Sequence, residues 1–498
     1  GSVKVNGTTY ALLMNGTMDI VAADSIELKS TNTSGTTMIA GSGSLNLTAP
    51  NGITLDTTSG YAMSLGGDFT ATTSKGSFST KGMNSVNTLN IEAYGDVTVE
   101  GPNGYFAASG TDGTNRIESK TGDVKINGTT YALRVNGTMD IVAANIIEIK
   151  SIDTSGATMI AGSGSLNLTA PNGIMLDTTS GYGMSLSGDF TAKVANGTFS
   201  TKGGNSARSL NIEAKGDITL SGKNAYWSAF GSEYSSSVVS TEGTITVTTM
   251  DDDYGTAIMG SGDFLMSAPK GIAINCANPY AVSVSGDFTA KTTGGAFTAK
   301  GYFCCENIDI DAYGDVTITS YISLESEDDG TGRIVSRNGK IDVSIPEEYE
   351  AVIYRGNWTF ESKNGTTLTA NSALNPERGV FYDALTLDVT GPLKLVNIGG
   401  GYVVRNDLTI KGEGVTMIGA PAGLSNAVIT YENRNGKAYA VYEGASEAAL
   451  TAADHEAAGE IYSGYLDANV VKFAEAANVS TQDVKKLELE LAGFDTDN

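Results

Sequence analysis

The strongest constraint on this chain is that it repeats its own sequence. The stretch "GSGSLNLTAPNGI" begins at Gly41 and returns letter for letter at Gly162, 121 residues later. A less exact third copy, "GSGDFLMSAPKGI", begins at Gly260, only 98 residues further on. Self-similarity over tens of residues is typical of proteins in which each repeat stacks on the next. A domain count from length alone therefore does not apply.

A shorter cadence runs inside each block. "GDVTVEG" at Gly95, "GDVKING" at Gly122 and "GDITLSG" at Gly216 open alike and then alternate apolar and polar residues. This period of two is typical of strands with one buried face. Two further short strands follow before the cycle restarts, roughly every 24 to 28 residues. Three strands and three turns per cycle predict one coil of a parallel β-solenoid.

We therefore predict an all-β, single-chain parallel β-helix of about 18 coils over residues 1–434. It consists of repeat blocks at about 1–121, 122–242 and 243–338, followed by degenerate coils over 339–434. At roughly 4.8 Å per coil, the rod would be about 85 Å long. The interior is expected to hold Val97, Val99, Ile53, Leu55, Ile91 and the residues 121 positions further on.

The shorter second interval has a structural interpretation. The second block contains "GDVKINGTTYALRVN" at 122–136, for which the third block has no equivalent. We interpret this stretch as a 15-residue coil that was lost, together with 8 residues trimmed from the next loop. A solenoid tolerates the loss of a whole coil, because each coil contacts only its neighbours.

Residues 435–498 differ in composition. "AVITYENRNGKAYAVYEG" predicts a hairpin that turns at Asn435–Gly436, and the Ala-, Glu- and Lys-rich tail after it predicts helix. This hairpin-plus-helix module would cap the last coil, whose open edge invites aggregation, or dock onto another subunit. The single histidine, His455, lies in this tail, so we expect it to be structural or on the surface.

Charge and composition exclude several functions. The net charge is -25 and there is no basic cluster, which argues against nucleic acid as a partner. The chain has no apolar run of membrane-spanning length, so we expect no membrane insertion. It opens with "GSVKVNG", without a signal peptide, and we expect a processed product or a fragment.

The recurring aspartate of the Gly-Asp corners argues against catalysis. A catalytic carboxylate pair should occur once. These aspartates recur at coil starts and are expected to accept hydrogen bonds at corners: Asp68, Asp96, Asp189, Asp217, Asp287 and Asp315. We therefore expect no enzyme.

Two denser acidic loops are the only candidates for a metal. Both are flanked by glycine and rich in oxygen ligands, as Ca²⁺ requires, but neither has the spacing of a known calcium motif. The loops contain Asp251, Asp252 and Asp253, and Glu325, Glu327, Asp328 and Asp329. The alternative is that these are solvated loop acids. Ca²⁺ is the one cofactor that the sequence suggests.

The three cysteines allow one covalent hypothesis. Cys276 ends a strand, and Cys304 and Cys305 lie in what we interpret as the matching loop of the next coil. Equivalent backbone positions in neighbouring coils are roughly 5 Å apart, within reach of a disulfide. We predict that Cys276 bonds one of the pair if the protein is exported. Three thiols are the alternative.

Aromatic residues accumulate in the third copy and provide a candidate binding surface. Loops at the same point of successive coils should stack into one column, and exposed aromatics there would suit a glycan or protein ligand. Packing between the loops is the alternative. The candidates are Trp227, Phe230, Tyr234, Tyr254, Tyr280, Tyr302 and Phe303.

The coil sequences "GSLNLTAPNGITLDT" and "LNIEAYGDVTVEG" resemble the β-solenoid passengers of bacterial surface proteins. Filamentous-haemagglutinin-like adhesins and autotransporter passengers are the nearest types. The resemblance covers about residues 1–434 and implies an exported rod on the bacterial surface. Its partners would be a host-cell or matrix glycan or protein, copies of itself, or other subunits of a surface assembly.

Two other functions remain open at this point. Phage tail spikes and injection-device needles or fibres also use repeated "GDVTI"-like coils, which would place the chain in a virion. A polysaccharide lyase or hydrolase can share the fold, although the sequence offers no singular catalytic constellation.

Overall fold

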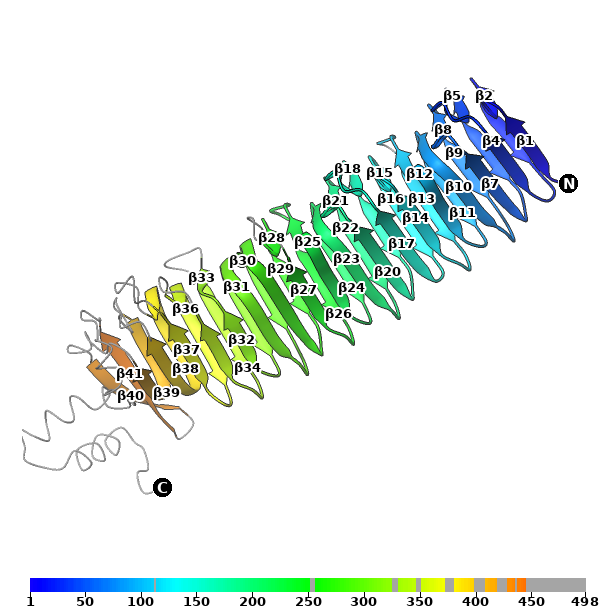
Figure 1. Ribbon diagram of the computed structural model, residues 1–498. Helices are drawn as coiled ribbons and strands as arrows, with labels where there is room; N and C mark the ends of the chain where they lie inside the picture. The colour runs from blue at the N-terminus through cyan, green and yellow to red at the C-terminus, as the bar shows by residue number, and fades with distance from the viewer. Residues whose placement is uncertain are drawn as a thin grey trace, which may run out of the picture. The chain divides into compact units, whose positions relative to one another are not determined.

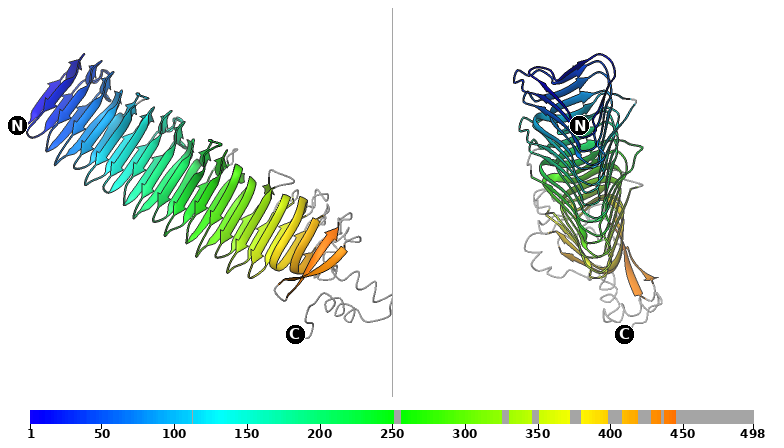
Figure 2. Two further views of the ribbon diagram at one scale, coloured as in Figure 1. Left: turned by 180° about the vertical axis from the view of Figure 1, so that it is seen from behind. Right: turned by 90° about the vertical axis from the view of Figure 1, so that its right-hand side faces the viewer.

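The computed structural model divides into two compact units, Gly1–Ser267 and Ala268–Asn498. It describes residues 1–111, 113–250, 256–324, 330–345, 351–371, 380–397, 408–418, 428–434 and 437–444. All regular elements within these residues are β-strands (Figure 1). Each unit is a β-solenoid of stacked turns, which are the coils predicted from the sequence. Each full turn contributes strands to three parallel columns (Figure 2). The predicted fold class is confirmed.

The first column of unit 1 begins each turn. Its strands pair in parallel with those of the turns before and after. They are β1 (Val3–Gly7), β4 (Ile26–Ser30), β7 (Gly52–Thr57), β10 (Ser77–Val86), β12 (Val97–Ala108), β14 (Val124–Gly128), β17 (Ile146–Ser151), β20 (Gly173–Thr178), β23 (Thr198–Ala207), β25 (Ile218–Ala229) and β27 (Ile245–Thr249).

The second column contains short strands and the second halves of β10, β12, β23 and β25. Its separate strands are β2 (Leu12–Met14), β5 (Ile39–Gly41), β8 (Tyr61–Leu65), β15 (Leu133–Val135), β18 (Ile160–Gly162), β21 (Tyr182–Leu186) and β28 (Ile258–Gly260). The third column contains β3 (Met18–Val21), β6 (Leu45–Thr48), β9 (Phe69–Thr72), β11 (Leu89–Ala93), β13 (Thr114–Ser119), β16 (Thr138–Ala143), β19 (Leu166–Thr169), β22 (Phe190–Val194), β24 (Leu210–Ala214), β26 (Ser236–Ser240) and β29 (Phe264–Ser267).

Unit 2 is built in the same way, with longer strands that serve more than one column. They are β30 (Gly271–Lys291), β31 (Ala296–Ala312), β32 (Val316–Thr319), β33 (Ile322–Leu324), β34 (Thr331–Ser336), β35 (Ile341–Ser344), β36 (Ile353–Ser362), β37 (Thr366–Ala370), β38 (Phe381–Asn397) and β39 (Leu408–Ile418). The structure supports about 14 turns. The sequence-based prediction was about 18 coils over residues 1–434.

The core is formed by the inward residues of all three columns. Along most strands buried residues alternate with exposed or half-exposed ones, as the period of two predicts. The ten residues predicted to lie inside are at most 2% exposed: Val97, Val99, Ile53, Leu55, Ile91, Ile218, Leu220, Ile174, Leu176 and Ile212. An aspartate in place of Ile174 would bury an unpaired charge.

The register explains the 121-residue period. The first inward residues of successive turns are Val3, Ile26, Ile53, Phe78, Val97 and Val124, so one block contains turns of 23, 27, 25, 19 and 27 residues. The second block, from Val124 to Ile245, has the same five turn lengths in the same order. One block is therefore five turns.

The register also corrects the explanation of the 98-residue interval. Residues 122–136 are not a coil of their own, because β14 and β15 lie there as two of the three strands of a 23-residue turn. That turn, from Val124 to Ile147, has the same length as the difference between 121 and 98. The third copy therefore lacks one whole turn, and no separate trimming of a loop is needed.

In the 19-residue turn β10 runs from the first column into the second without a loop between them, and the turn buries a polar pair. Gly82 at φ 88° turns β10 from the first column into the second. Beside it the buried Asn84 donates to Gly82 O at 2.8 Å and accepts from Thr80 Oγ1 at 3.0 Å. Thr201, Gly203 and Asn205 repeat this arrangement in β23. Each buried amide has partners, as a buried polar group requires.

The predicted hairpin is present at the end of the described chain. β40 (Val428–Arg434) pairs antiparallel with β41 (Lys437–Gly444), and Arg434 lies opposite Lys437. β41 also pairs antiparallel with β39 and so covers one edge of that strand. Asn435, Gly436, His455 and the predicted helical tail lie outside the described residues.

The Thr201–Asn205 pair gives a test of the core. We expect Thr201→Val to cost about 1–3 kcal/mol, because it leaves a buried amide oxygen without a donor. Asn205→Leu alone should also destabilise the protein. Its cost in free energy of unfolding should be smaller in the Thr201→Val background, where no hydroxyl is left unpaired. Urea unfolding of the four proteins measures this cycle. Strictly additive losses would show that the two side chains do not act as a pair.

Candidate functional site

The aromatic residues predicted to form one exposed column are divided between the core and the surface. Trp227 and Phe303 are 0% exposed and Tyr302 is 5% exposed. Trp227 lies in register with Ile258, and Phe303 lies in register with Val282, both buried residues of the second column. The prediction of an exposed column is wrong for these three, because they lie within a strand rather than in a loop.

The remaining aromatic candidates lie on the surface. Phe230, Tyr234 and Tyr280 are 40–50% exposed, whereas Tyr254 lies outside the described residues. Phe230 and Tyr234 follow β25, at the corner between the second and third columns, and Tyr280 lies within β30. Tyr280 and Tyr302 are neighbours in register, so part of the predicted stacking is present.

Tyrosines form a stack at one corner of unit 2. The Tyr302 and Tyr321 rings are stacked with centroids 4.6 Å apart, and the Tyr354 ring lies 5.2 Å from that of Tyr321. Tyr302 and Tyr354 are buried, so the stack contributes chiefly to packing. In unit 1, burial raises the pKa of Tyr105 and of its repeat partner Tyr226.

The structure places all three cysteines. Cys304 and Cys305 lie opposite Ser283 and Val284, so neither is in register with Cys276, and the geometric reason for a disulfide is wrong. All three are present as thiols, and Cys276 Sγ lies 3.1 Å from Tyr280 O. The predicted calcium loops lie outside the described residues. Among the residues that the structure describes, no cluster of three metal-binding side chains occurs.

The Gly-Asp aspartates are corner hydrogen-bond acceptors, as predicted. Each accepts from a residue one turn further along the chain, for example Asp217 from Thr244 N at 2.8 Å and Asp315 from Lys340 N at 2.9 Å. The other four accept from Asn87, Asp123, Arg208 and Asn307. These carboxylates join neighbouring turns.

One corner aspartate, Asp189, forms an ion pair with an arginine of the next turn. The Arg208 guanidinium donates to it through Nε at 2.9 Å and through a second nitrogen, and Ser209 Oγ donates at 2.8 Å. Hydrogen bonding by Arg208 is the main cause that lowers the pKa of Asp189. The same guanidinium lies over the Tyr234 ring, 4.6 Å from its centroid. In the first block the equivalent pair is Asp68 with the neutral Asn87.

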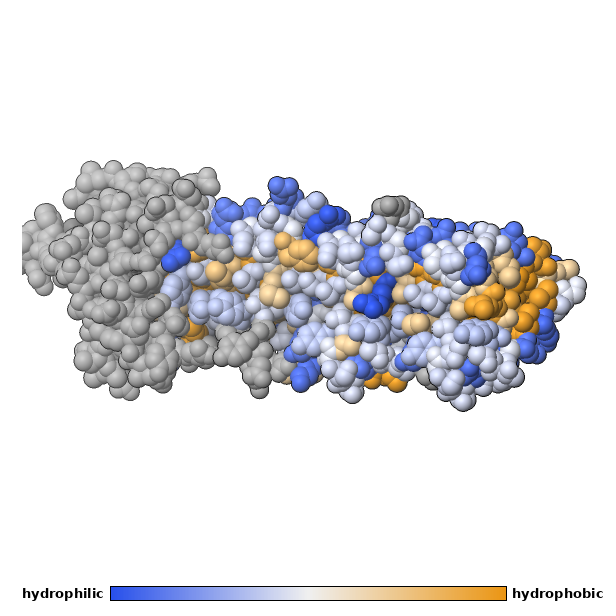
Figure 3. Space-filling view, turned by 90° about the horizontal axis from the view of Figure 1, so that it is seen from above, coloured by the Kyte–Doolittle hydropathy of each residue, from blue (hydrophilic) through white to orange (hydrophobic). Residues whose placement is uncertain are grey.

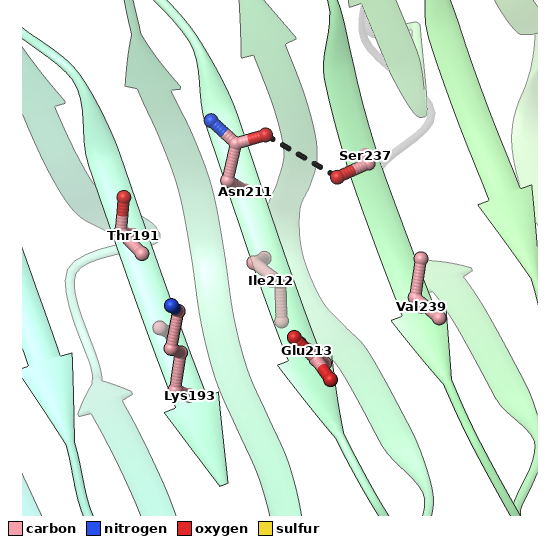
Figure 4. Close-up of a pocket in the computed structure, with 8 residues that line it drawn as sticks. Thr191, Lys193, Asn211, Ile212, Glu213, Ser237 and Val239 are labelled. Carbon is pink, nitrogen blue, oxygen red and sulfur yellow. Dashed lines mark hydrogen bonds between the residues drawn. The ribbon is translucent and has the colours of Figure 1, made fainter.

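A recess on the outward face of the third column is the candidate binding site. It has a volume of about 190 Å³ and crosses three neighbouring strands, β22, β24 and β26 (Figure 4). Ala192 and Ile212 are buried beneath it. Its outward lining residues are Thr191, Lys193, Asn211, Glu213, Ser237 and Val239.

The polar groups of the recess are arranged in register. Lys193 lies opposite Glu213, and Asn211 lies opposite Ser237. Ser237 Oγ donates to Asn211 Oδ1 at 3.2 Å, which is the dashed contact in Figure 4. Lys193 and Glu213 are exposed. Such a recess can receive hydrogen-bond donors and a positive charge at Glu213. Sequence reasoning missed it, although the copies differ visibly at position 237.

Apolar surface also gathers at the end of unit 1 where β1–β3 lie (Figure 3). Leu13 is 68% and Val21 is 73% exposed. Val3 and Val5 are half-buried, whereas their repeat partners Val124 and Ile126 are 0% exposed. In the second block those partners are covered by β12.

Comparison with known proteins gave no relatives: no protein-family model, curated protein or solved structure matches the chain. Within the described residues, no helix is both long and apolar enough to cross a membrane.

The Asp189–Arg208 pair predicts a pH dependence. Because the folded pKa of Asp189 lies below its usual 3.8, its contribution to stability is present above pH 3.8 and is lost as the pH falls through the lowered pKa. Asp189→Asn should therefore lower the free energy of unfolding at pH 7. In acid, the difference in free energy of unfolding between this variant and wild type should become smaller. Urea unfolding between pH 2 and 7 measures this.

Asp68→Asn is the matched control, because its partner Asn87 carries no charge. Added salt should weaken the effect of Asp189→Asn but leave that of Asp68→Asn nearly unchanged. Equal salt dependence in both variants would contradict an ionic contribution from Arg208.

Proposed function

We propose that this chain is a non-catalytic extracellular rod that serves as an adhesin or as a structural component of a bacterial surface or filament. The observation that carries this proposal is the five-turn duplication. In unit 1 it presents equivalent outward side chains twice, at an interval of roughly 24 Å. Asn46 donates to Asp19 at 2.6 Å, and Asn167 repeats that bond to Asp140 at 2.8 Å. A repeated surface suits attachment to a repeated ligand, because linked sites add their binding.

The outward charges support a scaffold rather than a catalytic centre. Lys29 pairs with Asp56 at 2.9 Å, and Lys202 pairs with Asp177 at 2.9 Å. These pairs connect neighbouring turns, as the corner aspartates do. Hydrogen bonding by Lys29 lowers the pKa of Asp56, which keeps this carboxylate ionised rather than ready to donate a proton.

The organisation of the turns supports a single-chain rod over an interlaced needle. All three strands of each complete turn come from one chain, so the core of each unit closes without a second copy. A tail spike built from three separate coils shares this property, and oligomeric state distinguishes it from a monomeric adhesin.

The test uses the full chain in three measurements. We expect a monomer by size-exclusion chromatography with light scattering, saturable attachment to host cells or to immobilised matrix glycans and proteins, and no shortening of those glycans. A stable trimer that does not attach would favour the virion component. A fall in polysaccharide chain length would show an enzyme. Absence of attachment by a monomer to any of these surfaces would contradict the adhesin.

A further inference from the structure

The recess over β22, β24 and β26 occupies a place that an arginine fills in the other copies of the repeat. In the first block Asn90 lies opposite Arg116, and in the third Asp309 lies opposite Arg333. The equivalent pair in the second block is Asn211 and Ser237. The recess therefore exists because a serine stands where two related turns have a guanidinium.

Arg333 shows how this place binds a guanidinium. Its Nη1 lies 2.9 Å from Asp309 Oδ1 and 3.8 Å from Asp311 Oδ2, and its Nε lies 3.4 Å from Glu361 Oε1. Arg116 is held at the same place by Glu118 at 3.2 Å. Both guanidinium groups lie on the outward face of the column and remain partly exposed.

Two of these acceptor positions still carry a side-chain oxygen in the second block, whereas Val239 stands in place of Glu118. Asn211 stands at the position of Asp309, and Glu213 stands at that of Asp311. Ser237 is too short to reach the space that an arginine would fill, which leaves the recess open. We propose that the recess binds an arginine side chain of a partner protein, with Glu213 and Asn211 as its acceptors.

The charge of the chain favours a positively charged partner. The net charge is -25, which attracts basic proteins that come within about a Debye length. Lys193 does not exclude a guanidinium, because its equivalent Lys291, opposite Asp311, coexists with Arg333 in the third copy. Arginine is favoured over lysine because its planar fork can reach a carboxylate and an amide oxygen together.

The test is a methyl-NMR titration of the full chain with Nα-acetyl-arginine amide. The methyl groups of Val239 and Ile212 line the recess and report binding there (Figure 4). We expect their shifts to change and saturate, with a weak dissociation constant of about 1 mM or above, because an exposed ion pair adds little binding energy. The citrulline analogue has the same shape without the charge and should bind at least about tenfold more weakly.

Three variants localise the effect. Glu213→Gln should weaken binding of the arginine probe about tenfold, and Ser237→Arg should abolish it by filling the recess. Ser237→Ala keeps the recess open and should bind like wild type. Equal binding of the citrulline probe, retained binding in Glu213→Gln, or no shift at Val239 would each overturn the proposal.

The inference rests on the proposed function in one respect, which is that the arginine belongs to another protein. The two can fail separately. If the probe binds but the full chain attaches to no protein or glycan surface, the attachment function is wrong. The binding of a guanidinium in the recess is then still supported. If the chain attaches equally well with Ser237→Arg, the function stands and the recess is not its contact.

Discussion

The structure depends on the parallel backbone ladder between neighbouring turns. Each turn hydrogen-bonds to the next in register, so a residue is held about 4.8 Å from its equivalent one turn away. This fixed step stacks each inward residue on the inward residues of the neighbouring turns, and most of these positions are apolar. It also means that a polar inward residue needs a hydrogen-bond partner within the core. Asn84 and Asn205 do so with Thr80 and Thr201, whereas the third copy has Ala299 and Phe303 at the two positions.

The same step organises the outward face. Side chains at one register position stack along the column, so a charge can meet a partner from the neighbouring turn as well as from its own strand. Lys29 with Asp56 and Arg208 with Asp189 are examples. A single substitution in such a column changes only one place. This is how a serine at position 237 opens a recess while the turns on either side keep their packing.

Much of the fold could be predicted from the sequence, because alternation and repetition are both local signals. Ile53, Val97 and Ile174 were assigned correctly to the interior. The aromatic residues were not, because a strand and a loop rich in Gly and Ser look alike, and an error of one residue in the boundary reverses the face. Trp227 and Phe303 were misplaced for this reason. The expected register of Cys276 with Cys304 and Cys305 was wrong, because the register shifts between Asn275 and Tyr280. The recess was detectable in principle as an exchange of Arg116 for Ser237 between copies.

The register can be measured directly with paired cysteines on an outward face. Thr219 and Thr246 lie opposite each other in β25 and β27, and both side chains are partly exposed. Equivalent positions in adjacent turns are within disulfide reach, whereas a position two residues further along the strand is not. The account predicts that Thr219→Cys with Thr246→Cys forms a bond that mass spectrometry detects, and that Thr219→Cys with Thr248→Cys does not. A bond in the second pair in place of the first would contradict the stacked register.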